Sequence, residues 1–432
     1  MQRLITAETI LTGRAGQSVP KGAVLVDDDR IVAIGHRDDV SRQASNEAVL
    51  HEYAGHTVLP GLINCHVHLA LDASSEPLQH YLDSDDTDLL LAMVGRAQAA
   101  ARSGVTTLRD LGDRNGLVFH LRDAIEHGAL AGPRIVAAGA PLTPPSGHCH
   151  FFGGEVDGED DIRARIHDSA ARGADLIKIM ASGGQITPTS PPMWASQFTG
   201  EQLHLAVLEA NSAGLPVAAH AHGTEAIAAA VDAGVSTIEH CTWMANGGGY
   251  DTRDDVAKTM AEHGIHACLA WPPHWRAFLE RLGPERAEHI VNRVRWMRDL
   301  GVPMIPGTDA GLRGSHFTGF AEALGLYEHL GFSRDEIIEM ATTTAAKALG
   351  LSDVGTIAPG YSADLIAVKG DPRSNLDRLN GPGLVMVRGM LIVGFDGHFQ
   401  HWETSGSVVG HAGSVSITLG SSSVGVVSRE RS

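Results

Sequence analysis

The sequence predicts an α/β fold, a (β/α)8 TIM barrel with a small β-sandwich formed from both chain ends. The first observation is a repeat of a short apolar run, a loop and an amphipathic segment across residues 58–352. This repeat is typical of parallel βα units, and eight units close a barrel. The second is that β-prone segments separated by Gly, Pro and Asp precede and follow this stretch. An open doubly wound sheet is the alternative, but no GxGxxG follows the first strand.

The two chain ends are expected to form one module. Residues 1–57 contain short β-prone runs at 4–7, 23–26 and 31–35, and residues 353–400 contain further runs at 365–368, 384–387 and 390–393. We predict that 1–57 and 353–400 pair as the composite sandwich and that 58–352 form the barrel. Residues 401–432 are rich in Ser, Gly and Val, and we expect a poorly ordered tail there.

The barrel elements follow in order. Strands are predicted at 59–65, 105–109, 134–138, 175–180, 216–220, 237–240, 265–269 and 303–307. Helices are predicted at 89–101, 162–171, 200–213, 224–233 and 286–300, with two more at 322–329 and 334–349. Several of these helices are followed by Gly, the usual signal of a helix C-terminus.

Composition limits the function classes. The 33 basic and 51 acidic residues give a net charge of −18 without a basic cluster, which disfavours a nucleic-acid partner. No apolar run approaches the roughly 20 residues that span a bilayer, and no secretory signal is visible. Four scattered cysteines without a CxxC pair predict reduced thiols. We therefore expect a cytoplasmic protein that acts on a small molecule, and its 24 histidines suggest metal ligands.

Candidate ligands lie at the C-terminal ends of predicted strands, where barrels carry their catalytic groups. His66 and His68 are two residues apart, so they share one face of the first strand. Other strand ends supply Lys178, His220, His240 and, just after the eighth strand, Asp309. Imidazoles and a carboxylate suit zinc-like ions, so together these residues predict a binuclear site. Taken alone, a His-x-His pair is more often part of a polar loop.

Lys178 stands among apolar residues in its strand. A lone buried ammonium is costly, so this lysine must reach water, pair with Asp175, or be chemically altered. In the last case burial keeps it neutral enough to react with CO₂. The resulting carbamate has two oxygens that can bridge two metal ions.

Neighbouring residues have predicted roles at the same strand ends. His222 shares a face with His220 and is expected to contact substrate or support the ligands. In the sixth strand, alternation predicts that His240 points inward while Glu239 and Cys241 point away. Asp309 is the expected general base, close enough to a metal-bound water to take its proton.

Substrate contacts are predicted at the barrel mouth, from residues His148, His150, Arg109, Trp243, Arg313 and His316. His148 and His150 lie in a Gly-rich loop, where a second metal site is the alternative. The arginines can hold a substrate carboxylate or form structural salt bridges. Trp243 can line an apolar pocket or simply cover the barrel.

Six features of the sequence belong together: residues 60–68, the strand lysine, His220, His240, residues 308–311 and the segment 360–365. With them the chain resembles the metal-dependent amidohydrolase superfamily over about residues 1–395. Residues 174–184 and 218–223 are most similar to its Xaa-Pro dipeptidase and carboxypeptidase-like branch. That branch includes hydrolases of aryl amides and carbamates, among them enzymes that split ochratoxin, an N-aroyl phenylalanine.

The resemblance implies a deformed TIM barrel with a flanking β-sandwich and two divalent metals, usually zinc. His66, His68 and Asp309 would bind one metal, His220 and His240 the other, and carboxylated Lys178 would bridge them. The branch often carries an aromatic hydroxyl shortly after the sixth-strand histidine, where this chain has Thr242 and Trp243. It also departs from the pattern around residues 148–151. Both departures lie in the region that is expected to determine substrate specificity.

The expected activity is hydrolysis of an amide-type bond in an N-acyl amino acid or dipeptide, possible substrates including N-aroyl phenylalanines such as ochratoxin. A metal-bridging hydroxide would attack, with Asp309 taking the proton and returning it to the amine. The alternatives are a hydrolase of a non-peptide aryl amide, carbamate or lactam, a mononuclear deaminase, which needs no strand lysine, and a non-catalytic metal-binding scaffold. Relatives are commonly oligomers, so a homo-oligomer is also possible.

Overall fold

The computed structural model describes residues 1–394, and the middle of the chain forms two parallel sheets. One sheet has the order β6-β7-β8 and the other β13-β12-β11-β10-β9. Isolated parallel bridges continue this pairing, joining Leu142 to Ile179 and Val67 to Ala310. The strands are β6 (Leu62–Val67), β7 (Val105–Asp110), β8 (Arg134–Ala137), β9 (Ile177–Met180), β10 (Val217–Gly223), β11 (Thr237–Met244), β12 (His266–Ala270) and β13 (Met304–Gly307). All eight predicted strands are present. The sixth continues to Met244, beyond its predicted end at His240.

Strands from both chain ends form a further sheet, called here the terminal sheet. Its order is β16-β15-β14-β5-β1-β3-β4, with β2 paired to β1. β5 pairs in parallel with β1 and antiparallel with β14, so it joins the N-terminal to the C-terminal strands. The strands are β1 (Gln2–Leu11), β2 (Ser18–Pro20), β3 (Gly22–Asp27), β4 (Arg30–His36), β5 (Val49–Pro60), β14 (Leu365–Lys369), β15 (Leu384–Val387) and β16 (Met390–Val393). The two-layered sandwich and the domain boundaries stay predictions.

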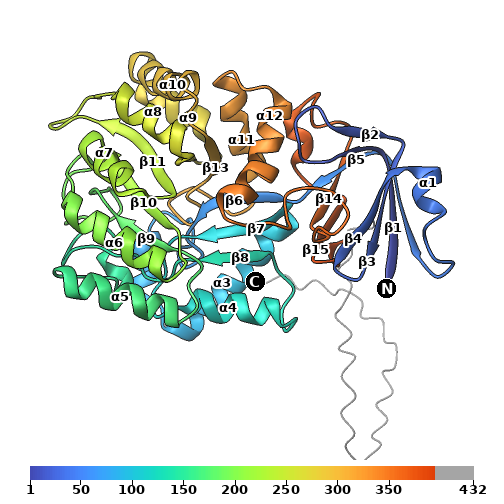
Figure 1. The fold of residues 1–432 in the computed structure, drawn as a ribbon, viewed down its shortest axis with the longest axis horizontal. Coiled ribbons are helices and arrows are strands. Elements are labelled where there is room, and N and C mark those ends of the chain that lie inside the picture. The colour runs from blue at the N-terminus through green and yellow to red at the C-terminus, as the bar shows by residue number, and fades with distance from the viewer. Residues whose placement is uncertain (395–432) are drawn as a thin grey trace, which may run out of the picture. The chain divides into compact units, whose positions relative to one another are not determined.

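Helices alternate with the parallel strands, and Figure 1 shows α5 to α8 outside the strands β9 to β11. A capping box at Thr199 fixes the start of α6, and left-handed glycines end α7 and α8 at Gly234 and Gly264. The helices are α1 (Arg37–Ser41), α2 (Pro77–Asp83), α3 (Asp86–Arg102), α4 (Leu117–Glu126), α5 (Glu159–Ala171), α6 (Gly200–Ser212), α7 (Thr224–Ala233), α8 (Asp254–His263), α9 (Trp275–Leu282), α10 (Pro284–Asp299), α11 (Phe320–His329), α12 (Arg334–Glu339) and α13 (Ala345–Ala348). The predicted helix at 334–349 is therefore interrupted by a π-helical turn, Met340–Thr344.

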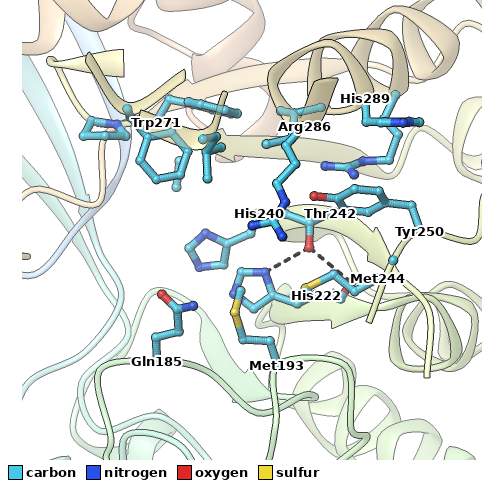
Figure 2. Close-up of a pocket in the computed structure, with 17 residues that line it drawn as sticks. Gln185, Met193, His222, His240, Thr242, Met244, Tyr250, Trp271, Arg286 and His289 are labelled. Carbon is cyan, nitrogen blue, oxygen red and sulfur yellow. Dashed lines mark hydrogen bonds between the residues drawn. The ribbon is translucent and has the colours of Figure 1, made fainter. Parts of the chain in front are cut away.

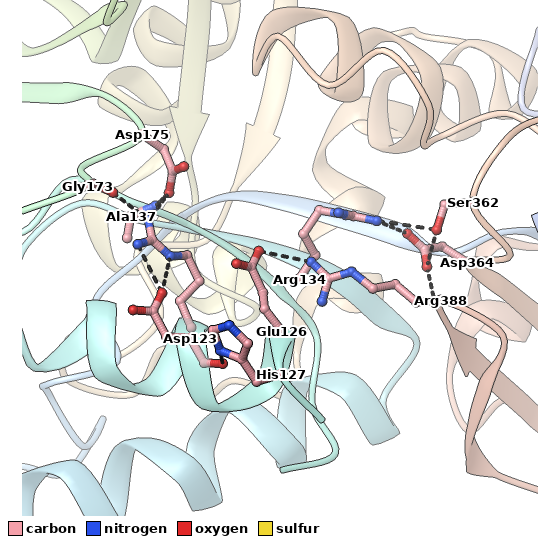
Figure 3. Close-up of polar contacts among 11 residues, drawn as sticks. Asp123, Glu126, His127, Arg134, Ala137, Gly173, Asp175, Ser362, Asp364 and Arg388 are labelled. Atoms are coloured by element: carbon pink, nitrogen blue, oxygen red, sulfur yellow. Dashed lines mark hydrogen bonds and ion pairs between the residues drawn. The ribbon is translucent and has the colours of Figure 1, made fainter. Parts of the chain in front are cut away.

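Ion pairs attach the terminal sheet to the parallel strands (Figure 3). Arg134 begins β8, and its guanidinium lies 3.3 Å from the buried carboxylate of Asp364. Arg388, between β15 and β16, lies 3.1 Å from Glu126 at the end of α4. Apolar contacts continue the attachment, because Ile366 and Val385 of the terminal sheet belong to the large core that also surrounds the parallel strands.

Within residues 1–394, no helix combines the length and the apolar character needed to cross a bilayer. The predicted tail at 401–432 lies outside the described residues. The cytoplasmic location and the homo-oligomer stay predictions.

Candidate metal centre

The first ligand group joins the end of β6 to the loop after β13. Oδ1 of Asp309 lies 3.2 Å from Nε2 of His66 and 3.3 Å from Nε2 of His68. The backbone sets this approach, because the amide of Asp309 donates to the carbonyl of His66. Gly307 permits it, since a Cβ there would come within 2.6 Å of the His66 Cβ. These three side chains can therefore hold one metal ion, as their ligand atoms all lie within 4.8 Å of one another.

The second group comes from β10 and β11. His220, His222 and His240 also place ligand nitrogens within 4.8 Å of one another. His222, predicted to contact substrate or to support the ligands, also lies in this group, and its Nδ1 lies 3.0 Å from the Thr242 hydroxyl (Figure 2). Burial and the neighbouring histidines hold the pKa of His220 and His240 well below its usual value, and lower that of His222 to about 3. All three are neutral at physiological pH, the form that binds metals.

Lys178 on β9 lies with both groups around one cavity of about 260 Å³. It is only 1% exposed, and its Nζ has no hydrogen-bond partner within residues 1–394. Asp175 does not pair with it, because that carboxylate accepts from Arg122 at 2.9 Å (Figure 3). Burial lowers the pKa of Lys178 to about 8, while Glu239 opposes this shift. Of the three possibilities for Lys178, reaching water and pairing with Asp175 are not observed.

The prediction that Glu239 points away from the site is wrong. Its fully buried carboxylate points inward and accepts hydrogen bonds from Nδ1 of His66 at 2.8 Å and from Arg109 at 2.7 Å. Alternation fails because His240 and Cys241 have φ values of 67° and 50°, which twist the end of the strand. Cys241 does point away, toward Met297 on α10. Burial would raise the pKa of Glu239, but Arg109 and His66 outweigh this and hold it well below its usual value.

Arg109 and Trp243 do not reach substrate space, which corrects both predictions. Arg109 is 2% exposed and donates hydrogen bonds to Glu239, Thr237 and the carbonyl of Cys65. It therefore forms a structural salt bridge, which was the alternative to holding a substrate carboxylate. Trp243 is fully buried, and its indole N–H donates to the sulfur of Met297. Its φ of 54° turns the ring toward α10 instead of the cavity.

The remaining predicted substrate residues divide in two. His148 lines the 260 Å³ cavity, with its ring 4.6 Å from that of His220. His150 does not line this cavity, and its Nδ1 lies 3.1 Å from the carbonyl of Gly147. Arg313 and His316 are exposed and line neither this cavity nor the pocket described next. The structure therefore brings only His148 of these four to the ligand groups.

A larger pocket, of about 800 Å³, opens from His222 and His240 and was not predicted. Apolar side chains form much of it, among them Met193, Met244, Trp271, Phe278, Leu282 and Ile290. Helix α10 contributes the basic side chains Arg286, His289 and Arg293 to its lining, and Figure 2 labels the first two. Their spacing marks one face of a helix that the sequence did predict. The spacing alone does not predict which face of the helix turns toward the strand ends, because tertiary packing decides this.

Comparisons with known proteins identify similar chains. Ochratoxinase of Aspergillus niger is 26% identical over 411 residues, covering 86% of this chain and 82% of the relative. The solved structure of a Xaa-Pro dipeptidase with bound methionine is 29% identical, with a TM-score of 0.78, covering 90% of this chain and 99% of the other. Molinate hydrolase, 20% identical with a TM-score of 0.79, shares the fold over 94% of this chain and 99% of its own.

The family model for the amidohydrolase family matches residues 57–396. The predicted superfamily and the predicted enzyme class, a hydrolase acting on C–N bonds, are thereby confirmed. The match spans well over half of the sequence, so the chain belongs to the amidohydrolase family.

Proposed function

We propose that this protein is a binuclear metal-dependent hydrolase that cleaves the amide-type bond of an N-acyl amino acid or a dipeptide. The observation that carries the proposal is Lys178, a buried lysine without a hydrogen-bond partner in residues 1–394 that faces the same cavity as both ligand groups. A charged lysine in that position would destabilise the folded protein, so Lys178 is expected to be neutral or modified. The mononuclear deaminase alternative gives it no role.

The donor set fits two zinc-like ions. His66, His68 and Asp309 would hold one ion and His220 and His240 the other, with a CO₂-derived carbamate on Lys178 between them. Bound there, such ions acidify water and polarise a carbonyl. We further propose that the eight parallel strands close into a (β/α)8 barrel, which the bridges at Leu142 and Val67 support, so that these residues share its C-terminal mouth.

Asp309 is the proposed proton carrier. Burial would raise its pKa, but His66 and His68 outweigh this and hold the pKa well below its usual value, so Asp309 is ionised. It takes the proton of the attacking water and gives it to the departing amine. We propose that His222 or His148 donates to the oxygen of the carbonyl as negative charge develops on it, which their position in the cavity lining supports.

The substrate class is drawn from the relatives and from the pocket. Ochratoxinase and the Xaa-Pro dipeptidase are named for amide substrates that contain an amino acid. The 800 Å³ pocket beside His222 and His240 has the size and apolar character of a small-molecule site. Both support an N-acyl amino acid with a large apolar group.

The test is metal content per chain, measured by elemental analysis on protein purified with bicarbonate and without chelator. We expect about two ions in the parent and a sharp fall in Lys178→Ala, with loss of hydrolysis of N-acyl amino acids and dipeptides. Lys258→Ala removes an exposed lysine of α8 and should change neither quantity. One ion in both the parent and Lys178→Ala would contradict the binuclear site and direct the search to deaminase substrates.

A further inference from the structure

Beyond the ligand groups, the 800 Å³ pocket has a cationic side. Arg286, His289 and Arg293 lie three and four residues apart, so α10 presents them on one face. Figure 2 shows the Arg286 side chain extending from its helix into the pocket. No acidic side chain lines this pocket among the described residues. The positive charge of Arg286 and Arg293 is therefore not balanced by an acidic side chain of the pocket lining.

Arg293 is the most informative of the three. It is 8% exposed, and its Nη1 is buried without a hydrogen-bond partner in residues 1–394. Its guanidinium carbon lies 3.6 Å from the centre of the Tyr250 ring, so the aromatic face covers one side of the cation. The other deeply buried arginine near the site, Arg109, has Glu239 as its partner. A buried guanidinium is costly without such an anion.

The chemistry of this side selects a carboxylate. A guanidinium presents planar paired donors that match a carboxylate, and although Tyr250 also accepts a hydrogen bond from Arg293, Nη1 is left without a partner in residues 1–394. Arg286 and His289 are exposed, so Arg286 can add positive charge and His289 a hydrogen-bond donor from the solvent side. The adjoining apolar wall, with Trp271 and Phe278, suits a large apolar side chain attached close to that carboxylate.

We propose that Arg293, supported by Arg286 and His289, forms a subsite for the free carboxylate of the amino-acid half of the substrate. The apolar wall of the same pocket then takes the side chain of that amino acid. This inference rests on the proposed function and deepens it, because it selects N-acyl amino acids with a large apolar side chain. A substrate whose carboxylate is amidated loses the contact.

The test measures binding of two probes that contain no scissile bond, by titration calorimetry on the metal-loaded protein. The probes are 3-phenylpropanoate and its neutral analogue 3-phenylpropan-1-ol, which share the phenyl group and contain no amide or ester bond. The parent should bind the carboxylate at least about tenfold more tightly, a difference of about 1.4 kcal/mol. Arg293→Met should abolish this preference. Arg295→Met removes an arginine of the same helix that contacts the backbone of His329 and Leu330 and does not line the pocket, so the preference should remain.

Two outcomes overturn the inference. In one, the parent binds both probes equally. In the other, Arg293→Met keeps the full preference, which would mean that the carboxylate is held elsewhere, such as at the metal centre. Should Arg293→Met fail to fold, the exposed double variant Arg286→Met, His289→Gln decides. It should lower the preference at least about threefold, and an unchanged preference overturns the inference.

Failure here is separate from failure of the proposed function. The probes are not hydrolysed, so their binding reports the subsite alone, whereas metal content and hydrolysis report the proposed chemistry. Amide hydrolysis with no carboxylate preference would reject only the subsite. A carboxylate preference without any amide hydrolysis would reject the proposed reaction.

Discussion

We predict that Glu239 stabilises the folded protein and also orients the imidazole of His66, a candidate metal ligand. The substitution Glu239→Gln keeps the shape of the side chain but removes its charge. Its carboxylate lies 2.7 Å from Arg109, and both residues are almost completely buried, at 0% and 2% exposure. Removing one partner of a buried pair costs about 3–5 kcal/mol, because the other charge stays in a medium of low polarity. We expect a loss of that size in the free energy of unfolding.

The measurement is urea denaturation of a double-mutant cycle. Arg109→Met and Glu239→Gln each leave one buried charge, whereas the double variant leaves neither. The double variant should therefore lose less stability than the sum of the single losses, with a coupling energy of about 1 kcal/mol or more. Glu262→Gln, which changes an exposed carboxylate on α8, should stay within about 0.5 kcal/mol of the parent. Additive single losses, or a loss below about 1 kcal/mol for Glu239→Gln, would refute the argument.

The same substitution should weaken metal binding. Nδ1 of His66 lies 2.8 Å from the Glu239 carboxylate, which fixes the ring and leaves Nε2 toward Asp309. Partners of this kind contribute about 10–100-fold to metal affinity. Competition with a chelator should show a loss in that range for Glu239→Gln and no loss for Glu262→Gln. Equal affinities in the two variants would mean that His66 is oriented by other contacts.

Three further predictions follow from the site. Asp309→Asn should lower the turnover of an N-acyl amino acid by about 100-fold or more, with an unchanged circular dichroism spectrum; turnover near the parent value would remove Asp309 from the proton transfers. Since the pKa of Lys178 is about 8, its neutral, reactive form predominates above that pH. Recovery of metal content after chelation, at fixed dissolved CO₂, should therefore be about tenfold faster at pH 9 than at pH 7, and a rate independent of pH would contradict carbamate formation. Gly307→Ala places a Cβ within 2.6 Å of the His66 Cβ, so urea denaturation should show a loss of about 1–3 kcal/mol, and an unchanged midpoint would show that the strands can separate.

The strand-end residues were predictable because the rule behind them needs little information. Short apolar runs locate the parallel strands, and the polar residue that ends each run then lies at one edge of the sheet. His66 and His220 follow this rule, whereas Lys178 stood out as a lysine among apolar residues, and the structure places all three around one cavity. Pairing of the two chain ends was also predictable, because turn signals and β-prone runs remain visible on either side of the βα repeat.

The rest depended on backbone angles and on packing. Alternation within the sixth strand gave the wrong direction for Glu239, and a position near the barrel mouth suggested a pocket contact for Trp243. Neither prediction allowed for the left-handed backbone at His240 and Trp243, which the residue types do not reveal. Left-handed angles strongly favour Gly, with a weaker preference for Asn, Asp and His, so a single His or Trp in a strand-like run does not predict one. Arg293 was missed for another reason. The helix was predicted, but the face of α10 that borders the pocket is set by the strands beneath it.

These left-handed residues explain how a regular fold produces an irregular site. Regular strands would send Glu239 and His240 to opposite faces, yet the site needs both, one as a support for His66 and one as a ligand. A φ of 67° at His240 resolves this conflict, and a φ of 56° at Asp309 does the same after β13. Each such residue costs roughly 1–3 kcal/mol, so both persist because the surrounding contacts hold them. For Asp309 these contacts include the hydrogen bond that its backbone N–H donates to the His66 carbonyl. This bond holds Asp309 beside the residue whose imidazole its carboxylate contacts. Backbone angles that cost free energy therefore occur where the proposed chemistry takes place, as expected if the strain serves the site.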